Sequence, residues 1–129
     1  MINLHKTIVS NLKTILPCHY EMILHSGITT PCISYMQLDN PTMAKGDTLE
    51  YSTITYQIKV WANNLSEIQE NAIKVDNKMR ALGFIRLNSR ELYDKNSTMI
   101  QKIMTYEIFM KEDFWRRLKY GYNFKRYYY

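Results

Sequence analysis

The chain has 129 residues, of which 46% are hydrophobic and 22% charged, and it carries a net charge of +5. This length favours one domain with a buried core, and no apolar run in the sequence approaches the ~20 residues that a membrane span requires. The first residues also lack the apolar centre of a signal peptide, so we expect a protein made in a cytoplasm, with no membrane partner.

The first element expected along the chain is an amphipathic helix over residues 2–16. Side chains three and four residues apart share one helix face, and here that face consists of His5, Ile8, Val9, Leu12, Ile15 and Leu16. Pro17 is expected to end the helix, since the residue before a proline avoids helical geometry. Residues 20–24 then predict a short strand, and Ser26 and Gly27 predict a turn.

A second strand is expected at residues 31–38, with Ile33 and Tyr35 on one face. Its first position is a proline, which suits a place where no N–H donor is needed. Residues 39–47 contain a further proline and a glycine, and we expect them to form an exposed loop.

The longest strand signal covers residues 48–61. Apolar and polar side chains alternate over its second half, which predicts one apolar face and one polar face. The apolar residues of the first half are out of phase with this alternation, so a bulge is expected near Ser52 and Thr53.

The second helix is expected to begin at Ser66. Ser66 can cap the first turn, and Gln69 three residues later completes a capping box. Gly83 fits the position just after the helix, where left-handed backbone geometry favours glycine. The apolar face of this helix consists of Ile68, Ala72, Val75, Met79 and Leu82.

Two strands are expected after the helix. Residues 84–87 predict a strand, residues 88–98 a polar loop, and residues 104–110 a final alternating strand. Strands on both sides of a single helix favour an α+β fold, with a mostly antiparallel sheet and two helices packed on one face. The other face is expected to be polar or to meet a partner.

The C-terminal residues differ in composition from the rest of the chain. Residues 1–113 contain twelve basic and twelve acidic residues, whereas residues 114–129 contain five basic residues, no acidic ones and eight aromatic ones. We therefore divide the chain into a domain at 1–110 and a basic aromatic docking extension at 111–129. The expected contact residues of this extension are Trp115, Arg116, Arg117, Tyr120, Lys125, Arg126, Tyr127 and Tyr128.

Two kinds of partner fit this extension. Aromatic rings set between basic residues can stack on bases while the charges contact phosphates. The same residues can instead pack on a neighbouring subunit, with arginines paired to acids across the interface. Docking on a subunit is favoured, because the domain at 1–110 shows no basic face of its own.

Residues of catalytic or metal-binding types form no recognised pattern. Cys18, His19, His25 and Cys32 are zinc-ligand types, but they lack the paired spacing of zinc sites. A thiol nucleophile at Cys32 lacks a local signature and lies in an expected core strand. The four glycines form no phosphate-binding loop. We expect no enzymatic activity, no cofactor and no metal.

Three short motifs follow one another along the chain: Pro31-Cys32-Ile33-Ser34-Tyr35, then Tyr56-Gln57-Ile58-Lys59-Val60-Trp61, then Leu82-Gly83-Phe84 at the helix end. Together with the size and the order of elements, they resemble tail terminator (tail completion) proteins of long-tailed bacteriophages. The resemblance covers roughly residues 1–110.

This resemblance implies a structural role without catalytic residues. Such proteins form hexameric rings that cap the tail tube and join it to the neck. The implied partners are copies of this chain, a tail tube protein and a neck or head-completion protein, in a virion assembled in the cytoplasm of a bacterial host. The loop at 39–47 would face a neighbour or the tube. The expected interface residues within the domain are Asp39, Met43, Lys45, Asp47 and Trp61.

The extension at 111–129 departs from the pattern of that family, because it is longer and more aromatic. It could embrace an adjacent subunit, reach a neck protein or line the DNA channel. Two alternatives therefore stay open. One is another head–tail connector or adaptor protein of the neck, and the other is a small nucleic-acid-binding module that uses the extension.

Overall fold

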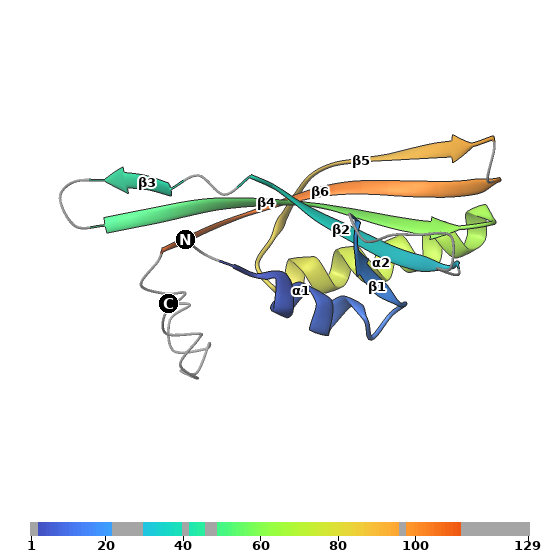
Figure 1. Ribbon diagram of the computed structural model, residues 1–129, viewed down its shortest axis with the longest axis horizontal. Helices are drawn as coiled ribbons and strands as arrows, with labels where there is room; N and C mark the ends of the chain where they lie inside the picture. Colours follow the sequence, from blue (N-terminus) through green and yellow to red (C-terminus); the bar gives the residue numbers. More distant parts are fainter. Residues whose placement is uncertain (1–2, 22–29, 40–41, 46–48, 96–97, 112–129) are drawn as a thin grey trace.

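The computed structural model describes residues 3–21, 30–39, 42–45, 49–95 and 98–111. Within them, the elements in chain order are α1 (His5–Leu12), β1 (Cys18–Tyr20), β2 (Cys32–Asp39), β3 (Thr42–Lys45), β4 (Leu49–Ala62), α2 (Leu65–Ala81), β5 (Ile85–Asp94) and β6 (Met99–Lys111). Figure 1 shows that the strands form one twisted layer and that both helices lie on the same side of it.

The strands form one six-stranded sheet in the order β1-β2-β4-β6-β5, and β3 pairs with the first part of β4. β1 and β2 run parallel, whereas every other strand pair in the described part of the chain is antiparallel. β4 pairs with β6 over twelve consecutive positions and forms the centre of the sheet. The prediction of an α+β fold with a mostly antiparallel sheet and two helices on one face is confirmed.

The hydrophobic core lies between the sheet and the two helices. Ile8 and Leu12 of α1 enter it, as do the predicted apolar face of α2 and the inward-facing residues of β4 and β6. Each aliphatic side chain buried in this way contributes about 1.5–3 kcal/mol relative to its exposed state. The largest fully buried side chains are Tyr56, Tyr106, Ile8, Leu12, Ile33, Ile54, Ile58, Ile68, Met79, Met104 and Val60.

The first helix is shorter than the sequence predicts. It ends at Leu12, and the N–H of Ile15 then bonds to the C=O of Leu12, a tighter spacing than that of an α-helix. This turn brings the chain to Pro17 and to β1, which begins at Cys18, two residues before the expected strand. β1 ends at Tyr20, so Glu21 does not continue the predicted strand, and residues 22–24 and the turn predicted at residues 26–27 lie outside the described residues.

β2, β3 and β4 form one long hairpin where the sequence predicts a loop at residues 39–47. β3 pairs with the beginning of β4 in the register that Asp39 and Thr55 already set at the end of β2. β2 and β3 are therefore two parts of one edge, separated by residues 40–41. The loop prediction is wrong for residues 42–45. The sequence does not predict the pairing of β3 with β4, because Pro41 stands just before β3 and proline cannot donate a hydrogen bond to a neighbouring strand.

The irregularity that the sequence assigns to β4 lies in β2. Pairing of β4 with β6 is unbroken through its first half, so the bulge predicted near Ser52 and Thr53 is wrong. The register of β2 against β4 instead shifts between Gln37 and Asp39, which leaves Leu38 as the extra residue. The bulge therefore lies on the outer strand β2, and the pairing of the central strand β4 with β6 stays regular.

Helix α2 is capped by Asn64 rather than Ser66. The side-chain Oδ1 of Asn64 accepts a hydrogen bond of 2.9 Å from the N–H of Glu67. The capping box predicted between Ser66 and Gln69 is therefore wrong, because asparagine caps as well as serine does and stands two residues earlier. The end of the helix is as predicted: Gly83 has a φ of 96°, in the region that favours glycine.

β5 and β6 form a second long hairpin, which includes much of the loop predicted at residues 88–98. β5 extends to Asp94, and its register against β6 shifts between Arg86 and Asn88, which leaves Leu87 as the extra residue. β6 begins at Met99, five residues before the predicted strand. Most side chains of β5 are exposed, so this edge strand lacks the alternation that identifies a half-buried strand.

Candidate assembly surface

The outer side of β5 is a long free edge of the sheet. β5 has ten residues and pairs with β6 on one side, and no strand in the described part of the chain pairs with its other side. Figure 1 shows β5 at the rim of the sheet. Backbone N–H and C=O groups along such an edge are available to a strand from another chain.

Large apolar side chains are exposed along this strand. Ile85 is 69% exposed, Leu87 51%, Leu92 45% and Tyr93 60%. They are four of the eight large apolar side chains that are exposed in the described residues, and a fifth, Phe109, lies on the neighbouring strand β6. Apolar side chains gathered on one strand indicate an interaction surface, whereas single exposed residues do not.

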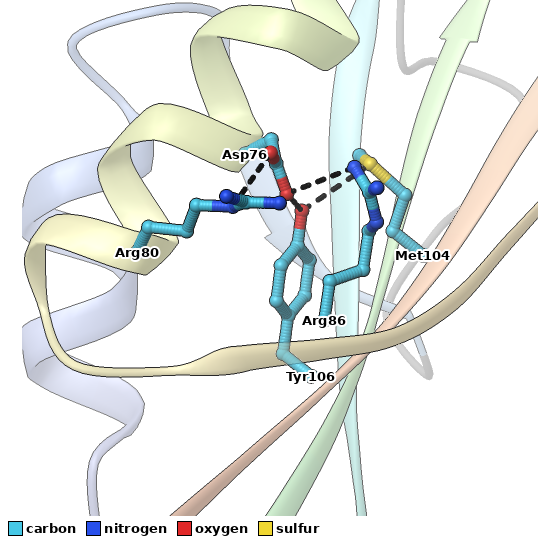
Figure 2. A network of polar contacts seen from close by, with 5 residues as sticks. All are labelled: Asp76, Arg80, Arg86, Met104 and Tyr106. Carbon is cyan, nitrogen blue, oxygen red and sulfur yellow. Dashed lines mark hydrogen bonds and ion pairs between the residues drawn. The ribbon is translucent and has the colours of Figure 1, made fainter.

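A carboxylate of helix α2 holds the beginning of β5. Asp76 accepts a hydrogen bond of 2.8 Å from the hydroxyl of Tyr106 in β6, and the same oxygen lies 3.3 Å from Nη1 of Arg86 in β5. Arg80, one turn later in α2, contacts the other oxygen at 3.0 Å. Figure 2 shows the two guanidinium groups and the hydroxyl converging on this carboxylate. The network thus joins α2, β5 and β6 at one point.

The hydroxyl of Tyr106 stays protonated in this network. Burial raises the pKa of Tyr106 far above its ordinary value, and the hydrogen bond to the Asp76 carboxylate raises it further. The side chain is fully buried, and the sulfur of Met104 lies 3.3 Å from its oxygen. A buried phenol that keeps its proton is suited to holding elements together rather than to proton transfer.

A second set of polar contacts holds the far half of β5. Oε1 of Glu91 lies 2.9 Å from Nζ of Lys102 in β6 and accepts a hydrogen bond of 3.3 Å from Nε2 of Gln69 in α2. Charged side chains on an edge strand normally discourage pairing with other chains. Glu91 and Arg86 are bound within their own chain, whereas Arg90 has neither an ion pair nor a hydrogen bond among the described residues.

The face of the sheet opposite the helices carries a row of half-buried side chains. The indole N–H of Trp61 donates a hydrogen bond of 2.9 Å to Oγ of Ser34. Nζ of Lys59 lies 5.9 Å from the Trp61 ring centroid and pairs with Glu21. The polar atom of Trp61, a predicted interface residue, therefore already has a partner within the sheet. The members of the row on β4 are Thr53, Thr55, Gln57, Lys59 and Trp61.

Three of the other predicted interface residues lie along one edge of the sheet, away from Trp61 on the open face. Asp39 ends β2, and Met43 and Lys45 lie in β3, so all three belong to the outer edge of the long hairpin. Asp47 and all the predicted contact residues of the extension at 111–129 lie outside the described residues.

The apolar residues of β5 are absent from the interface predicted by the sequence. They stand in two pairs, Ile85 with Leu87 and Leu92 with Tyr93, on either side of the polar residues 88–91. The polar residues 88–91 led to the prediction of a loop. The apolar residues on both sides of them are the feature of the sequence that indicates an exposed strand.

The cysteines are poorly suited to nucleophilic chemistry. Burial, with a further contribution from Cys32, raises the pKa of Cys18 to about 12, and burial also raises the pKa of the Cys32 thiol. Both thiols are free and protonated at neutral pH, so neither supplies a thiolate. In the described residues no group of three or more His, Cys, Asp or Glu side chains could hold a metal ion, and His25 lies outside them.

A shallow depression of about 400 Å³ lies between the end of α1 and α2, and it is lined by Thr14, Ile15, Lys74, Asn77 and Lys78. Lys74 is already engaged by Glu70 at 3.5 Å. An open hollow of this kind lacks the enclosed apolar walls of a small-molecule site. Among the helices described, none combines the length and the apolar character needed to cross a membrane.

One solved structure with a similar fold is a chain from the virion of a native gene transfer agent particle. The two chains share 10% sequence identity with a TM-score of 0.62, over 78% of this chain and 84% of that one. No protein-family model and no curated protein matches the sequence. The α+β architecture described above is thus shared with a protein of a virion, over most of the length of both chains.

Proposed function

We propose that this chain is a structural protein of a phage-like virion, where it forms a hexameric ring that caps the tail tube and joins it to the neck. The observation that carries the proposal is the fold shared with a virion chain over 78% of this protein. The resemblance of the strand and helix motifs to tail terminator proteins supports a place at the end of the tail tube. Its partners are then copies of itself, a tail tube protein and a neck or head-completion protein.

The described surface supports assembly rather than catalysis. A free strand edge with four exposed apolar side chains suits contact with another protein chain. The buried thiols keep their protons, and the Tyr106 hydroxyl is bound to a carboxylate. These groups therefore serve the stability of the subunit, and no enzymatic step is assigned to them.

Light scattering and negative-stain imaging of the purified protein, with and without tail tubes of the same particle, test the proposal. Rings should form either in solution or at the ends of tubes. Tubes are included because many assembly proteins stay monomeric until they meet their template. A protein that remains monomeric and leaves both tube ends bare would contradict the proposed function.

A head–tail adaptor of the neck is the nearest alternative. Such an adaptor is also a virion protein, but its ring binds to the head rather than to the end of the tail tube. In that case rings would bind the connector of DNA-filled heads and not isolated tail tubes. Imaging both preparations with the same protein distinguishes the two roles.

A nucleic-acid-binding module is the second candidate function, and the composition of residues 114–129 favours it. Five basic residues interleaved with aromatic ones can contact phosphates and stack on bases. This candidate predicts that the monomer binds DNA with a steep dependence on salt. The binding should be lost in the double variant Arg116→Ala and Arg117→Ala, which an electrophoretic mobility assay measures.

A further inference from the structure

The sheet has a second free edge, on the side opposite β5. β1 pairs with β2 only up to Tyr35. Beyond it, β2 from Met36 to Asp39 and the whole of β3 have no strand partner on their outer side in the described part of the chain. The described parts of this edge are Met36–Asp39 of β2 and Thr42–Lys45 of β3, eight residues against the ten of β5.

The two free edges run in opposite directions. β2 and β3 are antiparallel to β4, β4 is antiparallel to β6, and β6 is antiparallel to β5. Through the neighbouring strands, Arg90 is level with Lys59 of β4, and Asp39 is level with Thr55, four residues away. When a second copy in the same orientation is displaced along the strands by these four residues, β5 of one meets β2 and β3 of the other in antiparallel pairing. This is the more stable pairing, and it keeps the helices of both copies on the same side of the joined sheet.

One charge on each edge can pair with the other. Arg86 and Glu91 of β5 are engaged by groups of their own chain, whereas Arg90 has no ion pair or hydrogen bond among the described residues; Asp94 ends the strand. The opposite edge carries an acidic residue, Asp39, at the end of β2 and a basic one, Lys45, at the end of β3. An arginine on one edge and an aspartate on the other favour contact between two copies and disfavour contact between two β5 edges, which would bring arginines together.

The length of β5 is also sufficient for a specific contact. Ten residues of strand extend about 33 Å. A standard interface of ~800 Å² per partner is a patch roughly 30 Å across. The strand therefore spans a whole interface, and its exposed apolar side chains lie along that span.

We propose that β5 pairs with the free edge of β2 and β3 of a second copy, so that successive copies share one continuous sheet. This inference rests on the proposed ring and assigns the surfaces that join its subunits. The partner covers the exposed side chains of Ile85, Leu87, Leu92 and Tyr93, and Arg90 lies beside Asp39 of that copy. Because the two surfaces differ, the contact is head to tail, and a rotation that closes gives a ring rather than a dimer.

Cross-linking in the assembled state tests this contact. The double variant Arg90→Cys and Asp39→Cys, treated with a short bis-maleimide, should give a ladder of covalent multimers that ends at the size of the ring. Mixing the two single variants should stop at dimers. The unaltered protein is the first control, since Cys18 is half-buried and Cys32 buried. The second is Ile73→Cys with Asp39→Cys, which places one thiol on an exposed position of α2.

Lysine substitutions provide the second test. Leu87→Lys with Leu92→Lys places two charges on the edge of β5 and should abolish rings, while the circular dichroism spectrum and melting temperature stay close to those of the unaltered protein. Ile73→Lys introduces the same change at an apolar residue that is 61% exposed on α2 and should leave rings intact.

The outcomes separate this inference from the proposed function. Rings that form without the cross-link ladder, or that form normally with both lysines on β5, overturn the pairing of edges and leave the ring intact. An unaltered protein that forms no ring with or without tubes overturns both. A ladder together with loss of rings in the lysine variant supports the pairing.

Discussion

The hydroxyl of Tyr106 and the carboxylate of Asp76 lie 2.8 Å apart, although Tyr106 belongs to β6 and Asp76 to helix α2. Their hydrogen bond crosses from the sheet to the helix layer, and Arg86 at the beginning of β5 joins it. The same carboxylate therefore stabilises the subunit and engages a charge that would otherwise protect the edge of β5 from pairing. This links the packing of the domain to the surface proposed for assembly.

Removal of Asp76 should destabilise the protein more than removal of the Tyr106 hydroxyl. Tyr106→Phe deletes one hydrogen bond but leaves the carboxylate with two arginines, so a loss of ~1 kcal/mol in the free energy of unfolding is expected. Asp76→Ala leaves a buried hydroxyl without its acceptor, and we expect a loss of ~2–3 kcal/mol. Urea denaturation measures both.

The matched control for these variants is Tyr93→Phe, which removes a phenol hydroxyl from a side chain that is 60% exposed. Its effect should stay within ~0.5 kcal/mol. Equal losses for Asp76→Ala and Tyr106→Phe would show that the arginines contribute nothing to the network.

The position of the helix cap gives a second prediction. Asn64→Ala removes the hydrogen bond to the N–H of Glu67 and should cost ~1 kcal/mol. Ser66→Ala lies within the first turn of α2 and should change the stability by less than ~0.5 kcal/mol. The opposite order of losses in thermal or urea denaturation would place the cap at Ser66.

The sequence predicts those elements whose two faces differ in polarity. Ile54, Tyr56, Ile58 and Val60 are fully buried, and the polar residues between them lie on the open face, so the alternation alone identified β4. The apolar face of α2 was identified in the same way, because Ile68 and the residues three and four positions later face the core.

The elements that the sequence missed lie at the edges of the sheet. β3 and most of β5 read as loops, since an edge strand need not alternate and its backbone pairing leaves no trace in the side-chain pattern. The cap at Asn64 was missed because Ser66 is an equally good cap by composition. The sequence also does not predict the assembly surface on β5. Its exposed apolar residues, such as Tyr93, lie in or beside the segment that was predicted to be a loop.

Alkaline pH should destabilise the folded protein. Burial raises the pKa of Cys18 from 9.0 to about 12, so on unfolding the thiol ionises more readily. Its stabilising contribution is complete below pH 9 and is lost as the pH rises from 9 towards 12. Burial also raises the pKa values of Tyr56 and Tyr106, which extends the loss above pH 10.

Urea denaturation at neutral pH and at pH 9 and above measures this decline. The variant Cys18→Ala lacks the thiol and should show a shallower fall of stability between pH 9 and pH 10. A free energy of unfolding that stays constant or increases over that range would contradict the assignment of protonated, buried groups.

Truncation tests the role of the C-terminal extension. Deleting residues 114–129 should leave the domain folded, because the hydrophobic core of the described part of the chain lies between Leu4 and Met110. Assembly on tail tubes should be impaired, since the deleted residues carry the net charge and half of them are aromatic. Circular dichroism checks folding and negative-stain imaging checks assembly. Normal assembly by the truncated protein would exclude a docking role.

Electron microscopy of tail tubes incubated with the purified protein tests most directly whether this chain forms the ring that closes the tail tube. We expect a ring with six-fold symmetry at the end of the tube that faces the head. Tubes whose ends stay bare at saturating protein, with the protein monomeric beside them, would contradict it.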